Sequence, residues 1–218
     1  MESPLIQLLV LAGIAVFLIL RLKNVLGTRE GFEKPPLPKS NGRADRSGFE
    51  VIEGGPDRDI TDHVDENSTH AKALSAMKRV EPSFSVSEFL QGGRGAYEMI
   101  LMGFERGELD SIQPFMSEEI FDSFVEAVAH REDQGLTIEA DFLGVRETTV
   151  VEAKFDESEQ RAEITMRFVA EMTSVVRDRG GDIVEGDSKT VKKQKDTWTF
   201  ARDMGSDDPN WHLVATDA

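Results

Sequence analysis

An uninterrupted apolar segment near the N-terminus constrains this chain more than any other feature. Residues 4–20 read PLIQLLVLAGIAVFLIL, with no charged side chain and a single amide, Gln7. A helix of this length spans about 26 Å at roughly 1.5 Å per residue, close to the ~30 Å hydrocarbon core of a bilayer. It also satisfies its own backbone hydrogen bonds within lipid. The segment predicts a transmembrane anchor formed by Leu5, Ile6, Leu8, Leu9, Val10, Leu11, Ile14, Val16, Phe17, Leu18, Ile19 and Leu20.

The charges on either side of this segment predict its orientation. Only Glu2 precedes the apolar run, whereas Arg21, Lys23 and Arg29 follow it. Because positive charge is retained on the cytoplasmic side, we expect the N-terminus outside and the rest of the chain in the cytoplasm. A cleaved signal peptide would need a basic start and a small-residue cleavage site, and a transit peptide would be Arg-rich and amphipathic. The flanks therefore favour an uncleaved, single-pass anchor over residues 1–26.

A linker is expected to follow the anchor, over residues 27–70. Proline, glycine and charges of both signs replace the apolar periodicity there, a composition typical of disordered tethers. Asp57, Asp59 and Asp62 are spaced in a way that suggests a cation site. The glycine and bidentate carboxylate of a calcium loop are missing, however, so we interpret them as a solvated acidic stretch.

Composition excludes several functions for the remaining domain, residues 71–218. The chain has a formal charge of −16 and contains no cysteine. Nucleic acid is an unfavourable partner, because binding to phosphates draws its affinity from clustered Lys and Arg. Disulfides, thiolate metal sites and cysteine nucleophiles are impossible without cysteine. Membrane residence must then come from the apolar anchor, and we predict neither a cofactor nor a metal.

Helical periodicity dominates the first half of the domain. Residues 71–80 predict a short basic amphipathic helix whose apolar side either touches lipid or, as we favour, covers the core. Ser85 and Glu88 form a capping box for a second helix, which Gly107 ends. A short helix over 109–112 precedes Pro114, and Ser117 caps a third long helix. The expected buried residues are Val86, Phe89, Leu90, Tyr97, Ile100, Leu101 and Phe104 on the second helix, and Ile120, Phe121, Phe124, Val125 and Val128 on the third.

Glycines interrupt the second helix. Gly92, Gly93 and Gly95 each cost about 0.5–1 kcal/mol relative to alanine in a helix. They therefore predict that another element packs unusually close to this helix.

From Leu136 onward the apolar pattern changes to a period of two. Trp198 and Phe200 alternate with polar neighbours, as expected of strands with one packed and one wetter face. Turn-like sequences separate four such stretches, at residues 136–155, 161–177, 189–203 and 211–216. Helices followed by an antiparallel sheet define an α+β fold, whose curved sheet can enclose a pocket.

Several short motifs at the two ends of this domain resemble the Tim44-like family. They are Glu81-Pro82-Ser83-Phe84, Phe89-Leu90-x-Gly92, Ala96-Tyr97-Glu98-x-Ile100, Trp198-Thr199-Phe200-Ala201-Arg202 and Asp208-Pro209-Asn210-Trp211-x-Leu213-Val214-Ala215-Thr216. The resemblance covers about residues 71–218. It implies a cone-shaped fold of the nuclear-transport-factor-two-like class, with helices packed across a bent sheet and an apolar pocket between them.

The resemblance also implies a function. The mitochondrial member is a peripheral subunit of the inner-membrane protein translocase that binds lipid, the import channel and a seventy-kilodalton heat-shock chaperone, and bacterial relatives carry an N-terminal membrane helix. The chain departs from the family in having Gly93 where alanine is usual and in lacking the long charged chaperone-recruiting region. We therefore expect a membrane-tethered adaptor at the cytoplasmic face of a bacterial inner membrane. Its partner would be a translocase, a chaperone or a membrane-protein client; the sequence leaves the oligomeric state open.

Two classes of function remain to be distinguished by the site. An adaptor would bind a hydrophobic peptide, a lipid or a protein in an apolar pocket. A small-molecule enzyme of the same fold would instead need converging ionisable groups, for which Glu139 and Asp141 are the candidate pocket bases. We predict a binding role without catalysis. The candidate pocket residues are Phe89, Tyr97, Leu101, Phe124, Phe168, Trp198 and Phe200, of which Trp198 and Phe200 are also natural core residues.

Overall fold

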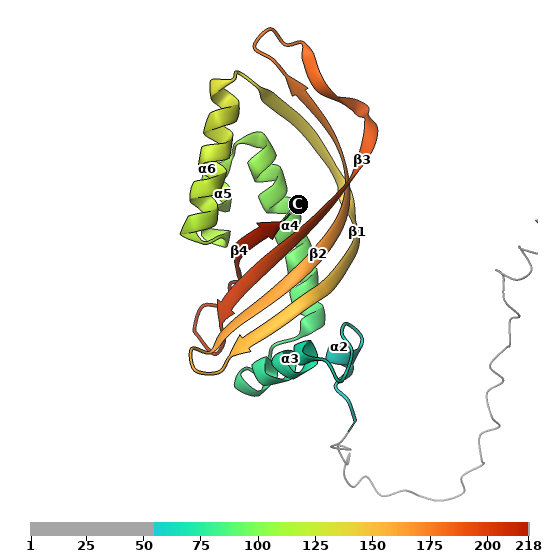
Figure 1. Ribbon diagram of the computed structural model, residues 1–218, viewed down its shortest axis with the longest axis vertical. Coiled ribbons are helices and arrows are strands. Elements are labelled where there is room, and N and C mark those ends of the chain that lie inside the picture. The colour runs from blue at the N-terminus through green and yellow to red at the C-terminus, as the bar shows by residue number, and fades with distance from the viewer. Residues whose placement is uncertain (1–54, 218) are drawn as a thin grey trace, which may run out of the picture. The chain divides into compact units, whose positions relative to one another are not determined.

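The strands form one antiparallel sheet in which each pairs with the next along the chain, in the order β1-β2-β3-β4. The computed structural model describes residues 55–217 (Figure 1). The predicted α+β class is confirmed. The strand bounds agree closely with the sequence except at β3, which begins before residue 189. The strands are β1 (Thr137–Asp156), β2 (Arg161–Arg177), β3 (Ile183–Asp203) and β4 (His212–Asp217).

Bulges explain why β1 does not alternate regularly and why the sheet bends. Its register against β2 shifts after Phe142, Val145 and Val150. Each shift inserts an extra residue, which bends the strand and increases its twist. As a result Phe142, Val145 and Val150 all remain on the face that carries Met172, Ala170 and Met166 of β2. The sheet consequently curves around the helices (Figure 1), and this concave side holds the core.

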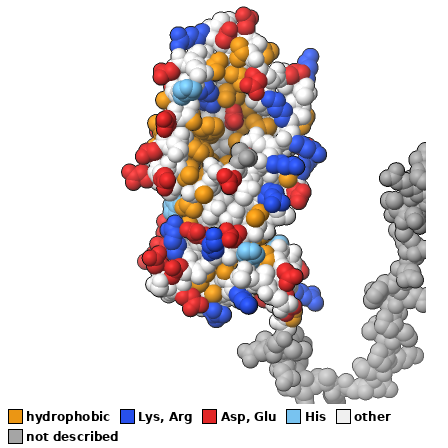
Figure 2. All heavy atoms as spheres, in the orientation of Figure 1, with side chains coloured by type: hydrophobic (Ala, Val, Ile, Leu, Met, Phe, Trp, Pro, Cys, Tyr) orange, Lys and Arg blue, Asp and Glu red, His pale blue; other side chains and the backbone are white. Residues whose placement is uncertain are grey.

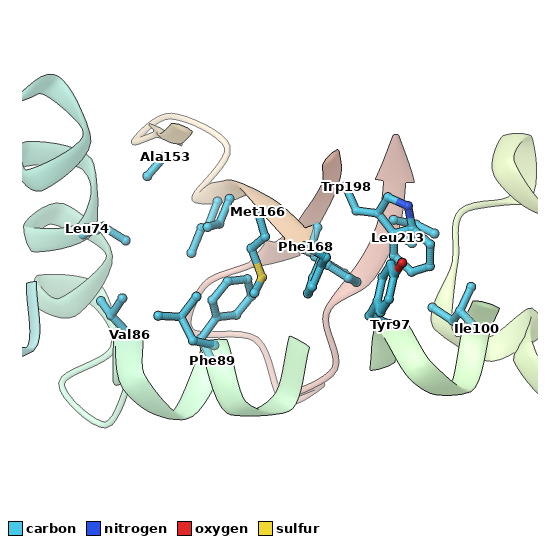
Figure 3. Close-up of a cluster of buried hydrophobic side chains, with 14 of the residues drawn as sticks. Leu74, Val86, Phe89, Tyr97, Ile100, Ala153, Met166, Phe168, Trp198 and Leu213 are labelled. Atoms are coloured by element: carbon cyan, nitrogen blue, oxygen red, sulfur yellow. The ribbon is translucent and has the colours of Figure 1, made fainter. Parts of the chain in front are cut away.

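The long predicted helix lies against the concave side as α4 (Val86–Arg106). Ser85 accepts a hydrogen bond from the Glu88 backbone N–H, and Gly107 ends the helix with φ of 72°, so both predicted ends are confirmed. Figure 3 shows Val86, Phe89, Tyr97 and Ile100 of this helix beside Met166, Phe168 and Trp198 of the sheet. The other helices are α2 (Arg58–Thr61), α3 (Thr69–Val80), α5 (Leu109–Ile112), the 3-10 helix η1 (Gln113–Phe115) and α6 (Glu118–Asp133).

Order begins earlier than the predicted domain start at residue 71. Ile60 in α2 is buried, and Asp59 forms an ion pair with Lys78 at 2.7 Å. The Asp59 carboxylate also accepts hydrogen bonds from the backbone N–H groups of Val86 (2.7 Å) and Ser87 (2.9 Å). Two free donors at the start of α4 are thereby satisfied. The interpretation of Asp59 as part of a solvated acidic stretch is wrong, because it ties residues before α3 to α4.

The apolar side of α3 packs onto the core, as the favoured interpretation predicts. Ala71, Leu74 and Met77 are buried, while Lys72 and Arg79 are exposed. Among the described residues, no helix combines the length and the apolarity needed to cross a membrane. The predicted anchor over residues 1–26 and most of the linker lie outside the described residues.

The packing of α6 differs from the sequence prediction. Of its five expected core residues only Val128 is buried. Ile120, Phe121 and Phe124 are half-buried, and Val125 is 41% exposed. The helix makes its main contacts with β4 and α5 rather than with the long strands, so the described residues cover only part of its apolar side.

Candidate binding cavity

A cavity of about 380 Å³ lies between the first half of α4 and the C-terminal end of β3. The segment before β4 completes its wall. Four aromatic side chains from two stretches of the chain line it: Phe84 and Phe89 from the first, Phe200 and Trp211 from the second. Together they make the apolar part of a concave wall, to which Ser83, Ser85, Glu88 and Asn210 add polar groups.

The aromatic rings hold one another in place. The rings of Phe89 and Trp211 have centroids 4.6 Å apart, and Phe84 lies 5.9 Å from Trp211. Phe89 also meets Phe200 edge-to-face at 6.3 Å. Such tilted and edge-to-face arrangements are the favourable ones for aromatic pairs. Because Phe89 and Phe200 are almost fully buried while Trp211 is half-buried, Trp211 is the ring best placed to meet an incoming ligand.

An ion pair closes one end of the cavity. The buried Arg202 guanidinium donates a hydrogen bond to the Glu81 carboxylate and a second, of 3.2 Å, to the Pro209 carbonyl oxygen. It also lies 5.6 Å from the centre of the Trp211 ring. The hydrogen bond from Arg202 holds the pKa of Glu81 below its usual range. The pair thus joins the end of α3 to β3 and to the segment that carries Trp211.

Two helix glycines line the cavity in different ways. A Cβ added at Gly93 would lie 2.8 Å from the Met166 sulfur, whereas one added at Gly92 would meet no atom within 4 Å. The same open space surrounds Gly95. The expected close approach therefore holds at Gly93 and is wrong for Gly92 and Gly95. Gly92 instead leaves room in the cavity beside Phe89.

The predicted pocket residues divide between this cavity and the sealed core. Phe89 and Phe200 line the cavity. Tyr97, Leu101, Phe168 and Trp198 are buried core residues; the Tyr97 ring stacks on Phe168 with centroids 4.4 Å apart. Phe124 is half-buried on α6, 4.7 Å from the ring of Phe104. The sequence therefore predicts which side chains face the concave side of the sheet. It does not distinguish the residues that line the cavity from those buried in the core.

Sequence reasoning missed the polar pair Tyr97 and Asp196. The Tyr97 hydroxyl donates a hydrogen bond to the Asp196 carboxylate, which is 5% exposed. Burial and this neighbouring carboxylate raise the pKa of Tyr97. The alternation of side chains along the strand could have predicted this pair. Asp196 lies two and four residues before Trp198 and Phe200, so it faces the same, inner side of the sheet.

The candidate catalytic bases do not lie in the cavity. Glu139 and Asp141 are exposed on β1, and Glu139 pairs with Arg177 at 3.0 Å. Asp141 borders a different, more polar cavity of about 430 Å³ beside α4 and α5. In the described part of the chain, no group of three His, Asp or Glu side chains could hold a metal ion. His70, expected in the linker, instead belongs to α3, where its Nδ1 accepts a 3.2 Å hydrogen bond from the Ala153 N–H.

The fold is an α+β domain of helices on a curved antiparallel sheet, with an aromatic-lined cavity between α4 and β3. Residues 70–218 match the Tim44-like domain family, and the chain belongs to that family. Over 147 residues it is 25% identical to the human mitochondrial import inner membrane translocase subunit TIM44, and 23% identical to the rat protein. The match covers 66% of this chain and 32% of either relative, so the chain spans about a third of their length.

Among solved structures, the intermembrane space region of chloroplast protein ARC6 aligns with 66% of this chain and 94% of its own, at 12% identity and a TM-score of 0.37. A likeness of this size carries no functional information.

Proposed function

We propose that this protein is a membrane-tethered adaptor whose domain holds an apolar segment of a partner in the cavity between α4 and the end of β3. One observation carries the proposal. Family motifs more than a hundred residues apart in the chain, near Phe89 and near Phe200, supply the aromatic walls of the same cavity. A cavity whose walls are aromatic residues of the family motifs favours binding over catalysis.

The relatives support a role in protein translocation. The human and rat proteins are subunits of a mitochondrial inner-membrane import translocase, and the shared region contains the whole cavity. By analogy, this chain serves as an accessory factor of protein transport at a membrane, without catalysis of its own. Since the shared region is about a third of those relatives, the analogy extends to the domain and not to chaperone recruitment.

The size of the cavity sets the expected strength of binding. If about 200 Å² of apolar surface leaves water at ~25 cal/mol per Å², the gross gain is near 5 kcal/mol before ordering costs. Binding by the isolated domain is therefore weak. Weak binding is sufficient for a tethered adaptor, because confinement at one membrane raises the effective concentration of both partners.

Filling the cavity from Gly92 tests this proposal. A Cβ at Gly92 meets no atom within 4 Å and Gly92 lines the cavity, so a phenylalanine there is expected to fill it; Gly95→Phe makes the same change on the same helix outside the lining residues. We expect Gly92→Phe to weaken binding of a short leucine-rich peptide at least about tenfold, equivalent to roughly 1.4 kcal/mol. The measurement is a titration of the full chain in detergent, followed by the fluorescence of Trp211, with Trp198→Phe as the background.

The control and the salt dependence make the result decisive. Gly95→Phe should bind the peptide as the parent does, and binding should persist at high salt because apolar burial is not screened. Equal binding by both phenylalanine variants, or loss of binding with added salt, would contradict the apolar cavity. Turnover of a small substrate would support the enzyme alternative instead.

The proposed anchor has its own test. With all nearby positive charge C-terminal to the apolar run, the chain is expected to stay in the bacterial inner membrane with the domain cytoplasmic. A cytoplasmic reporter fused after Ala218 should be active and a periplasmic one inactive. Reversal of that pattern, or a mature N-terminus mapped beyond Leu22, would refute the topology.

A further inference from the structure

Opposite charges are concentrated on α6 and on residues 189–195 of β3, a basic stretch that follows Glu185 and Asp187 on the same strand. Lysines gather on β3, with no carboxylate among residues 189–195, while six carboxylates lie on α6. All of these side chains are exposed, and none of the ion pairs within residues 55–217 involves them. The lysines are Lys189, Lys192, Lys193 and Lys195, and the carboxylates are Glu118, Glu119, Asp122, Glu126, Glu132 and Asp133.

Both elements also leave apolar side chains uncovered. On α6, Val125 is exposed and Phe121 is half-buried, although the helical period places them on an apolar side. On β3, Ile183, Val184 and Val191 are each about half exposed. These three are a large share of the exposed large hydrophobic residues in the described part of the chain, and such clusters mark interaction surfaces.

One face of the domain displays this arrangement as a whole. Figure 2 shows acidic side chains along the edge formed by α6, basic side chains along the opposite edge where β1 and β3 lie, and hydrophobic side chains between them. Burial raises the pKa of Glu105 of α4, and the nearby charges of Arg131 of α6 and Lys192 of β3 partly oppose that rise. A face of this kind is self-complementary, since a two-fold rotation lays each acidic edge on a basic edge and the apolar centre on itself.

We propose that this face docks against the same face of a second copy, with α6 of each chain lying over β3 of the other. Charge selects this pairing, because α6 against α6 or β3 against β3 would bring like charges together. A second copy supplies both complementary edges at once. The dimer would cover the apolar residues of α6 that the described residues leave half-buried. This inference does not depend on the cavity beside Trp211.

Charge reversal tests the pairing in the full chain. We expect Asp122→Lys with Glu126→Lys to raise the dimer dissociation constant at least about tenfold, and Lys189→Glu with Lys192→Glu to do the same. An equimolar mixture of the two variants should regain association, since each then presents the charge that the other lacks. Sedimentation velocity in detergent gives the constants. The matched control reverses Lys72 and Arg79, which lie on α3 and should leave dimerisation unchanged.

Directed crosslinking identifies the contact, because the natural chain has no cysteine. Asp122→Cys and Lys192→Cys chains carrying different tags should form a disulfide with each other when mixed with a mild thiol oxidant, and much less with themselves. A wild-type chain that stays monomeric at all concentrations, or a disulfide formed mainly between two Asp122→Cys chains, overturns the proposal. Binding of the β3 lysines to anionic vesicles by a monomer would assign this surface to the membrane and overturn it as well. Since no peptide is present, these outcomes are independent of the cavity test.

Discussion

Replacing Trp198 with alanine is expected to lower the free energy of unfolding by about 3–5 kcal/mol. The indole is 5% exposed at the centre of the concave sheet. Its ring lies 4.7 Å from Tyr97, 5.9 Å from Phe168 and 6.3 Å from Phe200. Removal therefore costs the transfer free energy of a large side chain and leaves a cavity that rigid neighbours cannot fill. Urea denaturation of the domain measures the loss.

The second tryptophan provides the comparison. Trp211 is half-buried at the cavity wall, so Trp211→Ala should cost clearly less stability than Trp198→Ala while reducing binding of the leucine-rich peptide. If the two substitutions cost the same, the assignment of Trp198 to the core and Trp211 to the wall would be wrong.

Removing Glu81 should also have a large effect, of about 3 kcal/mol, because it leaves the buried Arg202 charge without its partner. Only 8% of the Arg202 side chain is exposed, and the same carboxylate accepts a hydrogen bond from the Gly205 N–H at 3.2 Å. Glu157→Ala is the matched control. It removes a carboxylate 3.5 Å from Arg79 in a pair whose side chains are 68% and 76% exposed, so it should change stability by less than about 1 kcal/mol.

The lowered pKa of Glu81 predicts that the stability of the fold is sensitive to acid. The hydrogen bond from Arg202 lowers the pKa of Glu81 in the folded chain. Burial alone would raise the pKa of Asp59, but hydrogen bonds from Lys78, Ser87 and Val86 outweigh it and lower the pKa. Because both folded pKa values lie below the unfolded ones near 4, this stability is present above about pH 4 and is lost as the pH falls. The urea midpoint should fall as the pH drops below about 4, and it should fall less steeply in Glu81→Ala. An equal dependence on pH in both chains would exclude Glu81 as a source of the acid sensitivity.

Local rules were sufficient to predict the long helices and the four strands, but not α2 or η1. Ser85 and Gly107 bound α4 as the sequence indicates, because a side-chain cap and a left-handed glycine act within a few residues of the helix end. The four strands follow from the period of two for the same reason. The bent β1 was not predictable in detail, since its bulges are set by pairing with β2. The sequence placed the start of this strand at residue 189, whereas β3 begins at Ile183 and includes Gly186, whose φ is 82°.

Side-chain partners required the tertiary structure. Asp59 appears in the sequence as one of several acidic residues in a proline- and glycine-rich stretch, yet it caps α4 from 27 residues away. From the sequence alone, Phe89 and Trp198 are equally plausible pocket residues. Only the packing shows that Phe89 lines a cavity while Trp198 is buried in the core. The apolar residues of α6 fit a core pattern, but the position of the helix beside β4 leaves them half open.

The sequence by itself determined that this chain combines an apolar N-terminal segment with an α+β domain of the Tim44-like family, because apolar runs, periodicity and caps are local properties. The tertiary structure decided which motif residues meet. Phe84 and Phe89 lie more than a hundred residues before Phe200 and Trp211 along the chain, and the curved sheet brings the two pairs around one cavity. Long-range contacts of this kind depend on the whole packed arrangement, so no local pattern encodes them.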